Sequence, residues 1–116
     1  MEHVLTAARP LHVIFFKTEA GNEPVREWLK ELPKDERYMI GEDVKKVQWG
    51  WPLGMPVVRP LGDGLHEIRT RLSNRIARVF FTVWEEKIVL LHGFIKKDQQ
   101  TPVEELRLAK KRKDLL

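Results

Sequence analysis

The chain has 116 residues, a formal net charge of +4 and no cysteine. This length fits one domain with a single hydrophobic core, and the lack of cysteine excludes disulfides and thiolate metal sites. No apolar run approaches the roughly 18 residues of a membrane-spanning helix, so we expect a cytoplasmic protein with no membrane partner. The basic excess favours a polyanion or an acidic protein as partner.

The N-terminal half predicts a strand followed by a helical hairpin. Residues 1–10 show no periodicity, so we expect a flexible leader before a single domain over residues 11–116. Residues 11–18 are rich in β-branched and aromatic side chains, which predicts a strand. Apolar residues recur at helical spacing over 24–32 and 34–49, with Pro33 between the two helices. Gly41 would allow a close neighbour in the second helix, and Trp49 and Trp51 would pin the next loop against the sheet.

The C-terminal half predicts four strands and a last helix. Residues 57–61 form a short strand, and residues 65–72 and 75–84 alternate between apolar and polar side chains. Residues 88–97 are apolar nearly throughout, which is typical of a central strand. The second of the long strands presents one apolar face, which we expect to pack against Trp28 and Val44; its members are Ala77, Val79, Phe81 and Val83. A helix over residues 102–113 ends the chain.

These elements give the order β-α-α-β-β-β-β-α. The fold class is α+β, with an antiparallel-dominated sheet of about five strands, an αα-hairpin and a C-terminal helix. We expect the helices to cover one face of the sheet.

Three arginines form the first candidate site. Strand parity places Arg69 and Arg71 on one face, and Arg78 opposite the apolar face of its strand, so all three should look away from the helices. The guanidinium fork suits phosphate oxygens. The alternative is a solvated sheet face in which Arg69 pairs with Glu67.

The end of the last strand forms the second candidate site. His92 and Lys96 share strand parity, so one face could offer an imidazole that moves a proton and an ammonium that stabilises phosphate charge. The alternatives are a core histidine for His92 and a solubility charge for Lys97. The four histidines lack H-x-x-x-H or H-x-H spacing, so we expect no metal site.

The last helix ends in four cations, namely Lys110, Lys111, Arg112 and Lys113. They can compensate the helix dipole or contact the phosphates of RNA.

Several phrases of the sequence resemble a known toxin family. PVREWLKELP, DVKKVQWGWPLGMPVVRPLGDGLHEIRTRL, RIARVFF and LLHGFIKKDQQTPVEELRLAKKR are similar to the phage-derived, HigB-like branch of the RelE/ParE toxin superfamily. The resemblance covers roughly residues 13–112 and implies a RelE-like fold. It also implies the toxin of a type II toxin-antitoxin system that acts as a ribosome-dependent mRNA endonuclease (mRNA interferase) and inhibits translation.

The resemblance also implies partners and site residues. A helix-turn-helix antitoxin would neutralise the protein, which would bind ribosome and mRNA, and operator DNA only through the antitoxin, without a cofactor. HEIR suggests Arg69, RVFF suggests Arg78, and GFIKK suggests Lys96 and Lys97 around the scissile phosphate. His92 or Lys96 would transfer protons in a metal-independent attack by the RNA 2′-hydroxyl, while Glu67 stands where some relatives have a lysine. Two other functions stay open: a ParE-like inhibitor of DNA gyrase, and a non-toxic co-repressor that binds the antitoxin.

Overall fold

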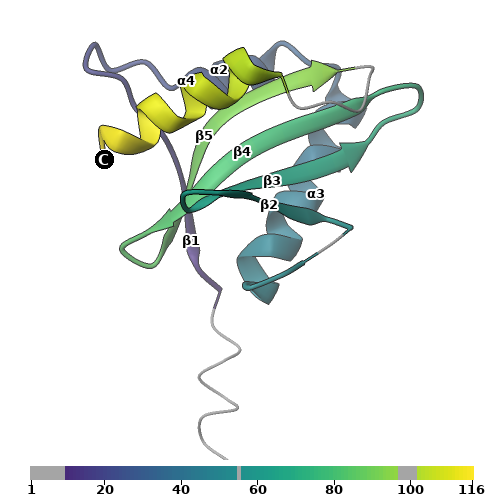
Figure 1. Ribbon diagram of the computed structural model, residues 1–116. Helices are drawn as coiled ribbons and strands as arrows, with labels where there is room; N and C mark the ends of the chain where they lie inside the picture. The colour runs from purple at the N-terminus through teal and green to yellow at the C-terminus, as the bar shows by residue number, and fades with distance from the viewer. Residues whose placement is uncertain (1–9, 55, 97–101) are drawn as a thin grey trace, which may run out of the picture.

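The computed structural model describes residues 10–54, 56–96 and 102–116 and contains the predicted order of elements (Figure 1). In chain order the elements are β1 (His12–Phe15), α2 (Pro24–Lys30), α3 (Lys34–Gly50), β2 (Val58–Gly62), β3 (Leu65–Arg71), β4 (Ile76–Trp84), β5 (Lys87–Lys96) and α4 (Val103–Asp114). The α+β class and the order β-α-α-β-β-β-β-α are therefore confirmed. No helix among these described residues is long and apolar enough to cross a membrane.

The five strands form one mixed sheet with the order β1-β5-β4-β3-β2. β1 runs parallel to β5, and the other three pairings are antiparallel, as an antiparallel-dominated sheet requires. The apolar strand β5 was expected in the centre. β5 is an interior strand, because β1 pairs with its other edge. The middle position of the five strands belongs to β4.

The helices lie on both faces of the sheet, so the expectation that they share one face is wrong (Figure 1). One core contains Val79 and Phe81 of β4, with Trp28 and Val44 from α2 and α3 packed against it, as predicted. The second core contains Phe80 of β4 and Ala109 of α4. The physical reason is that the second face of the sheet also carries large apolar side chains, which need a cover of their own.

A β-bulge in β5 breaks the alternation of side chains. Phe80 pairs with His92 and Phe81 pairs with Leu90, so Leu91 has no partner residue on β4. Two neighbouring side chains, Leu91 and His92, consequently lie on the face that α4 covers.

The loop that follows α3 is held by one of the two tryptophans expected there. The ring of Trp51 meets the ring of Phe81 edge-on at 5.6 Å and the ring of His66 at 4.8 Å. Partial burial in this cluster lowers the pKa of His66, because water solvates the imidazolium less well there. Trp49 was expected to do the same but is 54% exposed on α3. It faces solvent because it lies opposite the buried Ile40 and Val47 of the helix.

Candidate functional site

The register of β3, β4 and β5 places the predicted cations on one face of the sheet. Arg69 pairs directly with Arg78, while Arg71 pairs with Ile76, which pairs in turn with Lys96. Side chains of directly paired residues lie on the same face, so all four cations share the face that α4 partly covers. Lys97 was expected beside Lys96 and lies outside the described residues.

The sequence led us to expect that Arg78 points away from the helices. It lies instead on the face of the sheet that α4 covers. Its side chain is 0% exposed, and its Nη1 lies 3.5 Å from Oε2 of Glu67, which is 0% exposed as well. Neither carboxylate oxygen of Glu67 receives a hydrogen bond from the part of the chain that the structure describes. The expectation failed because it treated this face as open, whereas the apolar neighbours of Arg78 on β4 and β5 need cover.

Arg69 and Arg71 instead reach an open cavity at the end of β3. The cavity has a volume of 310 Å³ and is lined by Asp43, Pro56, Val57, Arg69, Arg71 and Ile76. Arg69 is half-buried and its Nε has no hydrogen-bond partner among residues 10–54, 56–96 and 102–116. The single carboxylate of the lining, that of Asp43, already pairs with Lys46 at 3.4 Å. The cavity is therefore positively charged and can accept an anion.

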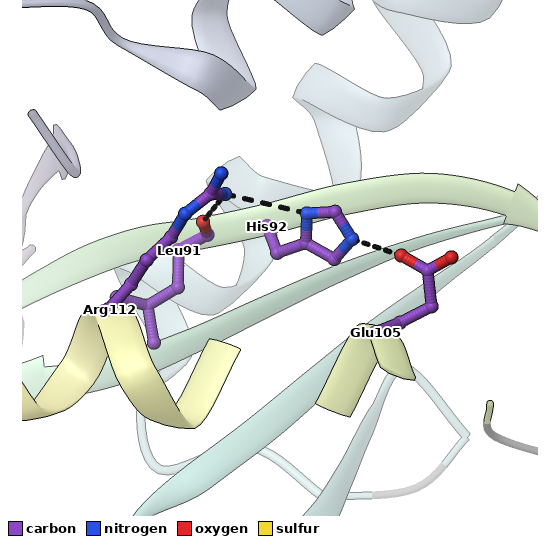
Figure 2. A network of polar contacts seen from close by, with 4 residues as sticks. All are labelled: Leu91, His92, Glu105 and Arg112. Carbon is purple, nitrogen blue, oxygen red and sulfur yellow. Dashed lines mark hydrogen bonds and ion pairs between the residues drawn. The ribbon is translucent and has the colours of Figure 1, made fainter. Parts of the chain in front are cut away.

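His92 is held by α4 rather than presented to solvent, as Figure 2 shows. Its Nε2 contacts a carboxylate oxygen of Glu105, and its Nδ1 lies 3.5 Å from Nη1 of Arg112. A guanidinium can only donate, so Nδ1 accepts and Nε2 carries the proton that it donates to Glu105. The geometry matches the alternative of a core histidine with both ring nitrogens satisfied.

Arg112 completes this network from the last turn of α4. Its Nη1 donates a 2.8 Å hydrogen bond to the carbonyl oxygen of Leu91, the unpaired residue of the bulge (Figure 2). The guanidinium also lies 5.8 Å from the centre of the Phe16 ring. Burial lowers the pKa of Arg112, because the charged form loses hydration. This arginine thus joins α4 to β5, whereas the sequence had offered compensation of the helix dipole or contact with RNA phosphates.

The other cations of α4 lie far from the arginine cavity. Lys110 pairs with Asp63 at 3.1 Å, in the turn that precedes β3. Lys113 lines a separate open cavity beside the same turn, and Lys111 is exposed. The cavity is at the opposite end of β3, and a strand of this length spans about 20 Å. The structure therefore does not bring the two groups of cations together.

One cation of this face was missed in the sequence. Arg59 of β2 is exposed and pairs with Glu67, so it lies on the same face as the arginines of β3. Strand parity alone could not have placed it, because an irregularity between Pro60 and Gly62 shifts the register of β2. Asp43 was missed for a different reason: it comes from α3, and only the folded chain places it beside the arginines.

The face therefore offers phosphate-binding cations and few other functional groups. Among the described residues there is no group of three or more histidines, cysteines or carboxylates that could hold a metal ion. Two guanidinium groups at an open cavity can bind a phosphodiester and neutralise the charge that develops on it.

No curated protein matches the chain in sequence. The model of the family described as "Phage derived protein Gp49-like (DUF891)" matches residues 27–114. The matched segment runs from within α2 to the end of α4 and includes the cations that share one face of the sheet, namely Arg59, Arg69, Arg71, Arg78 and Lys96. The chain thus belongs to the Gp49-like family of phage-derived proteins, a RelE/HigB-like family of toxins from toxin-antitoxin systems.

Proposed function

We propose that the protein is a toxin that cleaves mRNA on the ribosome and so inhibits translation. The observation that carries this proposal is the pair of guanidinium groups, Arg69 and Arg71, at a positively charged cavity on the open part of the sheet. The family supports an antitoxin as the neutralising partner. Ribosome and mRNA as partners, and operator DNA reached through the antitoxin, belong to the proposal.

The proposed reaction needs only RNA, protein side chains and water. The 2′-oxygen attacks the adjacent phosphorus and the bond from phosphorus to the 5′-oxygen breaks. The products are a 2′,3′-cyclic phosphate and a 5′-hydroxyl. The proton of the 2′-hydroxyl leaves to solvent, and a proton must reach the departing 5′-oxygen. Negative charge accumulates on the phosphorane, so fixed cations lower the barrier.

The structure suggests different roles for the candidate residues. Arg69 and Arg71 hold the phosphate because they line the cavity. We assign protonation of the leaving oxygen to Lys96, which lies on the same face of the sheet as Arg71 and two strands away, with Ile76 between them. Arg78 and Glu67 form a buried ion pair beside Arg69 and support its position. His92 has both ring nitrogens engaged by α4, so we assign it to anchoring the helix and not to proton transfer.

The test is expression of the toxin without antitoxin, followed by mapping of 5′-hydroxyl ends on translated messages. Wild type should cut at fixed positions in the reading frame, and an antibiotic that empties ribosomes of mRNA should abolish the cuts. Arg69→Ala should cut about 10²-fold less, which is typical for the loss of one charge stabiliser. Arg26→Ala is the matched control, because Arg26 is an exposed arginine of α2 that pairs only with the neighbouring Glu23 in the described structure.

Other results would point to the other two functions. Intact transcripts with DNA damage and gyrase-dependent arrest would indicate a gyrase inhibitor. Normal growth, together with operator binding only in the presence of antitoxin, would indicate a co-repressor. Arg78→Ala is a poor probe here, because removing one partner of a buried ion pair typically costs about 3–5 kcal/mol and would disturb the fold.

A further inference from the structure

The side of α3 that faces away from the sheet carries two large aromatic side chains. Tyr38 is 67% exposed and Trp49 is 54% exposed. They are about three helical turns, or roughly 16 Å, apart and lie on the same side of the helix. The buried Ile40 and Val47 lie on the opposite side, against the sheet. Tyrosine and tryptophan rings supply much of the binding energy of protein interfaces, so an exposed pair on one helix side indicates a contact surface.

Two opposite charges lie between the aromatic rings. Glu42 and Lys45 are exposed, and neither has an ion-pair partner in the part of the chain that the structure describes. Together with the two rings they form what we call the α3 stripe: Tyr38, Glu42, Lys45 and Trp49. The spacings along the α3 stripe are those of the a and d positions of a coiled coil. The stripe therefore fits a second helix.

The order of the α3 stripe is complementary to itself when it is reversed. In an antiparallel pair of α3 helices, Tyr38 of one copy faces Trp49 of the other, and Glu42 faces Lys45. In a parallel pair each residue would face its own copy, so like charges would repel. A pair related by a twofold axis uses the same surface on both copies, and this is the commonest symmetry of protein oligomers. The charges thus favour an antiparallel pair of identical chains.

An open cavity lies where the reversed helix would place its tryptophan. It has a volume of 600 Å³, is largely apolar and is lined by Lys34, Asp35, Tyr38 and Met39. In a coiled coil, four residues on successive turns of one helix form the hole that receives a side chain of the facing helix. Trp49 of a second copy supplies a large apolar ring for this hole.

Gly41 lies beside the α3 stripe and has open space around it. A Cβ atom at this position would meet nothing within 4 Å among the described residues. Glycine inside a helix is less favourable than alanine, and no contact within the described part of the chain requires it here. Because glycine has no side chain, a second helix can approach α3 closely at this point.

We propose that the α3 stripe is a self-association surface through which two copies of the chain form an antiparallel, twofold-symmetric dimer. Tyr38 of each copy packs on Trp49 of the other, and Glu42 and Lys45 form two symmetric ion pairs. The interface consists of one helix from each copy, so the dimer is weak and exchanges with the monomer. The arginines of β3 lie on the other face of the sheet, where α4 packs (Figure 1). The dimer is therefore independent of the proposed reaction.

The test is sedimentation equilibrium of the full chain at concentrations up to about 1 mM, which detects weak association. Glu42→Lys places lysine opposite lysine twice in the dimer, and Lys45→Glu places glutamate opposite glutamate twice. Each single variant should weaken the dimer at least about tenfold, because two attractive contacts become repulsive. An equimolar mixture of the two variants should dimerise again, since lysines then face glutamates. The double variant should also dimerise, with both pairs reversed.

Two further variants test the specificity of these effects. Lys111→Glu makes the same charge change as Lys45→Glu at an exposed position of α4, on the other face of the sheet, and should leave dimerisation unchanged. Trp49→Ala should weaken the dimer but leave the melting temperature of the dilute protein unchanged, because its ring is largely exposed in the monomer.

The inference is wrong if wild type stays monomeric at about 1 mM, and the α3 stripe would then be left for a helix of another protein, such as the antitoxin. It is also wrong if a dimer forms that ignores both charge reversals, or if the mixture of the two variants stays monomeric. Cleavage in cells is a separate result: 5′-hydroxyl ends without a dimer would retain the proposed function alone, and a dimer without such ends would retain the α3 contact alone.

Discussion

Gly93 shows how a single position can fix the packing of a helix on the sheet. A Cβ atom at this position would lie 2.5 Å from two ring carbons of Trp28, closer than any ordinary contact. The indole of α2 therefore lies directly on the backbone of β5. The sequence suggested Gly41 as the site of close approach, but a Cβ there would meet nothing within 4 Å among the described residues.

Gly93→Ala should destabilise the protein by about 1–3 kcal/mol, the usual cost of overpacking a core. Trp28→Leu should remove most of this penalty when the two changes are combined, because the new methyl group then has room. Urea unfolding of the four proteins in this cycle measures the effect. Gly41→Ala is the control and should be neutral or stabilising, since alanine is the better helix former. Additive effects of the two changes would contradict the contact.

At the scale of elements, α4 and β5 form one unit through the bulge. Leu91 has no register partner on β4 at the bulge, and Arg112 donates a hydrogen bond of 2.8 Å to its carbonyl oxygen. The same guanidinium faces Nδ1 of His92. The other ring nitrogen of His92 contacts Glu105, which lies about two helical turns before Arg112 on α4 (Figure 2). The helix is thus anchored at two points to adjacent residues of one strand.

Arg112→Ala should lower the free energy of unfolding by about 1–3 kcal/mol, because the buried carbonyl of Leu91 loses its hydrogen bond. Hydrogen exchange in α4 should accelerate more than exchange in β3 and β4, since the lost contact belongs to the helix. Lys111→Ala is the control on the same helix; it is exposed, and its effect should stay within about 0.5 kcal/mol. Equal effects of both changes would mean that the network does not anchor α4.

The sequence predicted the elements well and the bulge not at all. Alternation over residues 75–84 correctly separated Val79 and Phe81 from Arg78 and Phe80. Alternation cannot reveal an inserted residue, because the run around Leu91 is apolar on both sides. Strand parity also predicted that Arg69 and Arg78 lie on one face of the sheet. It could not predict how exposed they are, because their exposure depends on where α4 packs, which no local pattern specifies.

For the whole molecule, β4 is a partition between two separate cores. Phe80 and Phe81 are neighbours in sequence and both are 0% exposed, yet their rings lie on opposite faces. Phe80 packs edge-on against Phe94 at 5.2 Å, and Phe81 against Trp51 at 5.6 Å. Each side of the sheet thus has its own apolar layer, with α2 and α3 on one side and α4 on the other.

Phe80→Ala and Phe81→Ala should each cost about 3–5 kcal/mol, because each change leaves a cavity in a different core. The double variant should fail to fold, since the combined loss reaches the total stability of an ordinary domain, about 5–15 kcal/mol. Thermal melting and near-UV circular dichroism measure these effects, with the exposed Val103→Ala as control. A wild-type melting curve for Phe80→Ala would show that the second core contributes nothing.

The parallel pairing of β1 with β5 also sets the earliest point in synthesis at which the chain can complete its fold. The two strands are roughly 70 residues apart in the chain, and β5 is the only strand beside β1 in the described sheet. At about 5–20 residues per second, a ribosome needs about 4–14 s to deliver β5 after β1. During that interval β1 has no strand to pair with, and α4 is synthesised later still. If the message is cut upstream of the codons for β5, translation yields a fragment that lacks β5 and α4, in which neither core can form. Any cut upstream of those codons therefore prevents production of the folded protein.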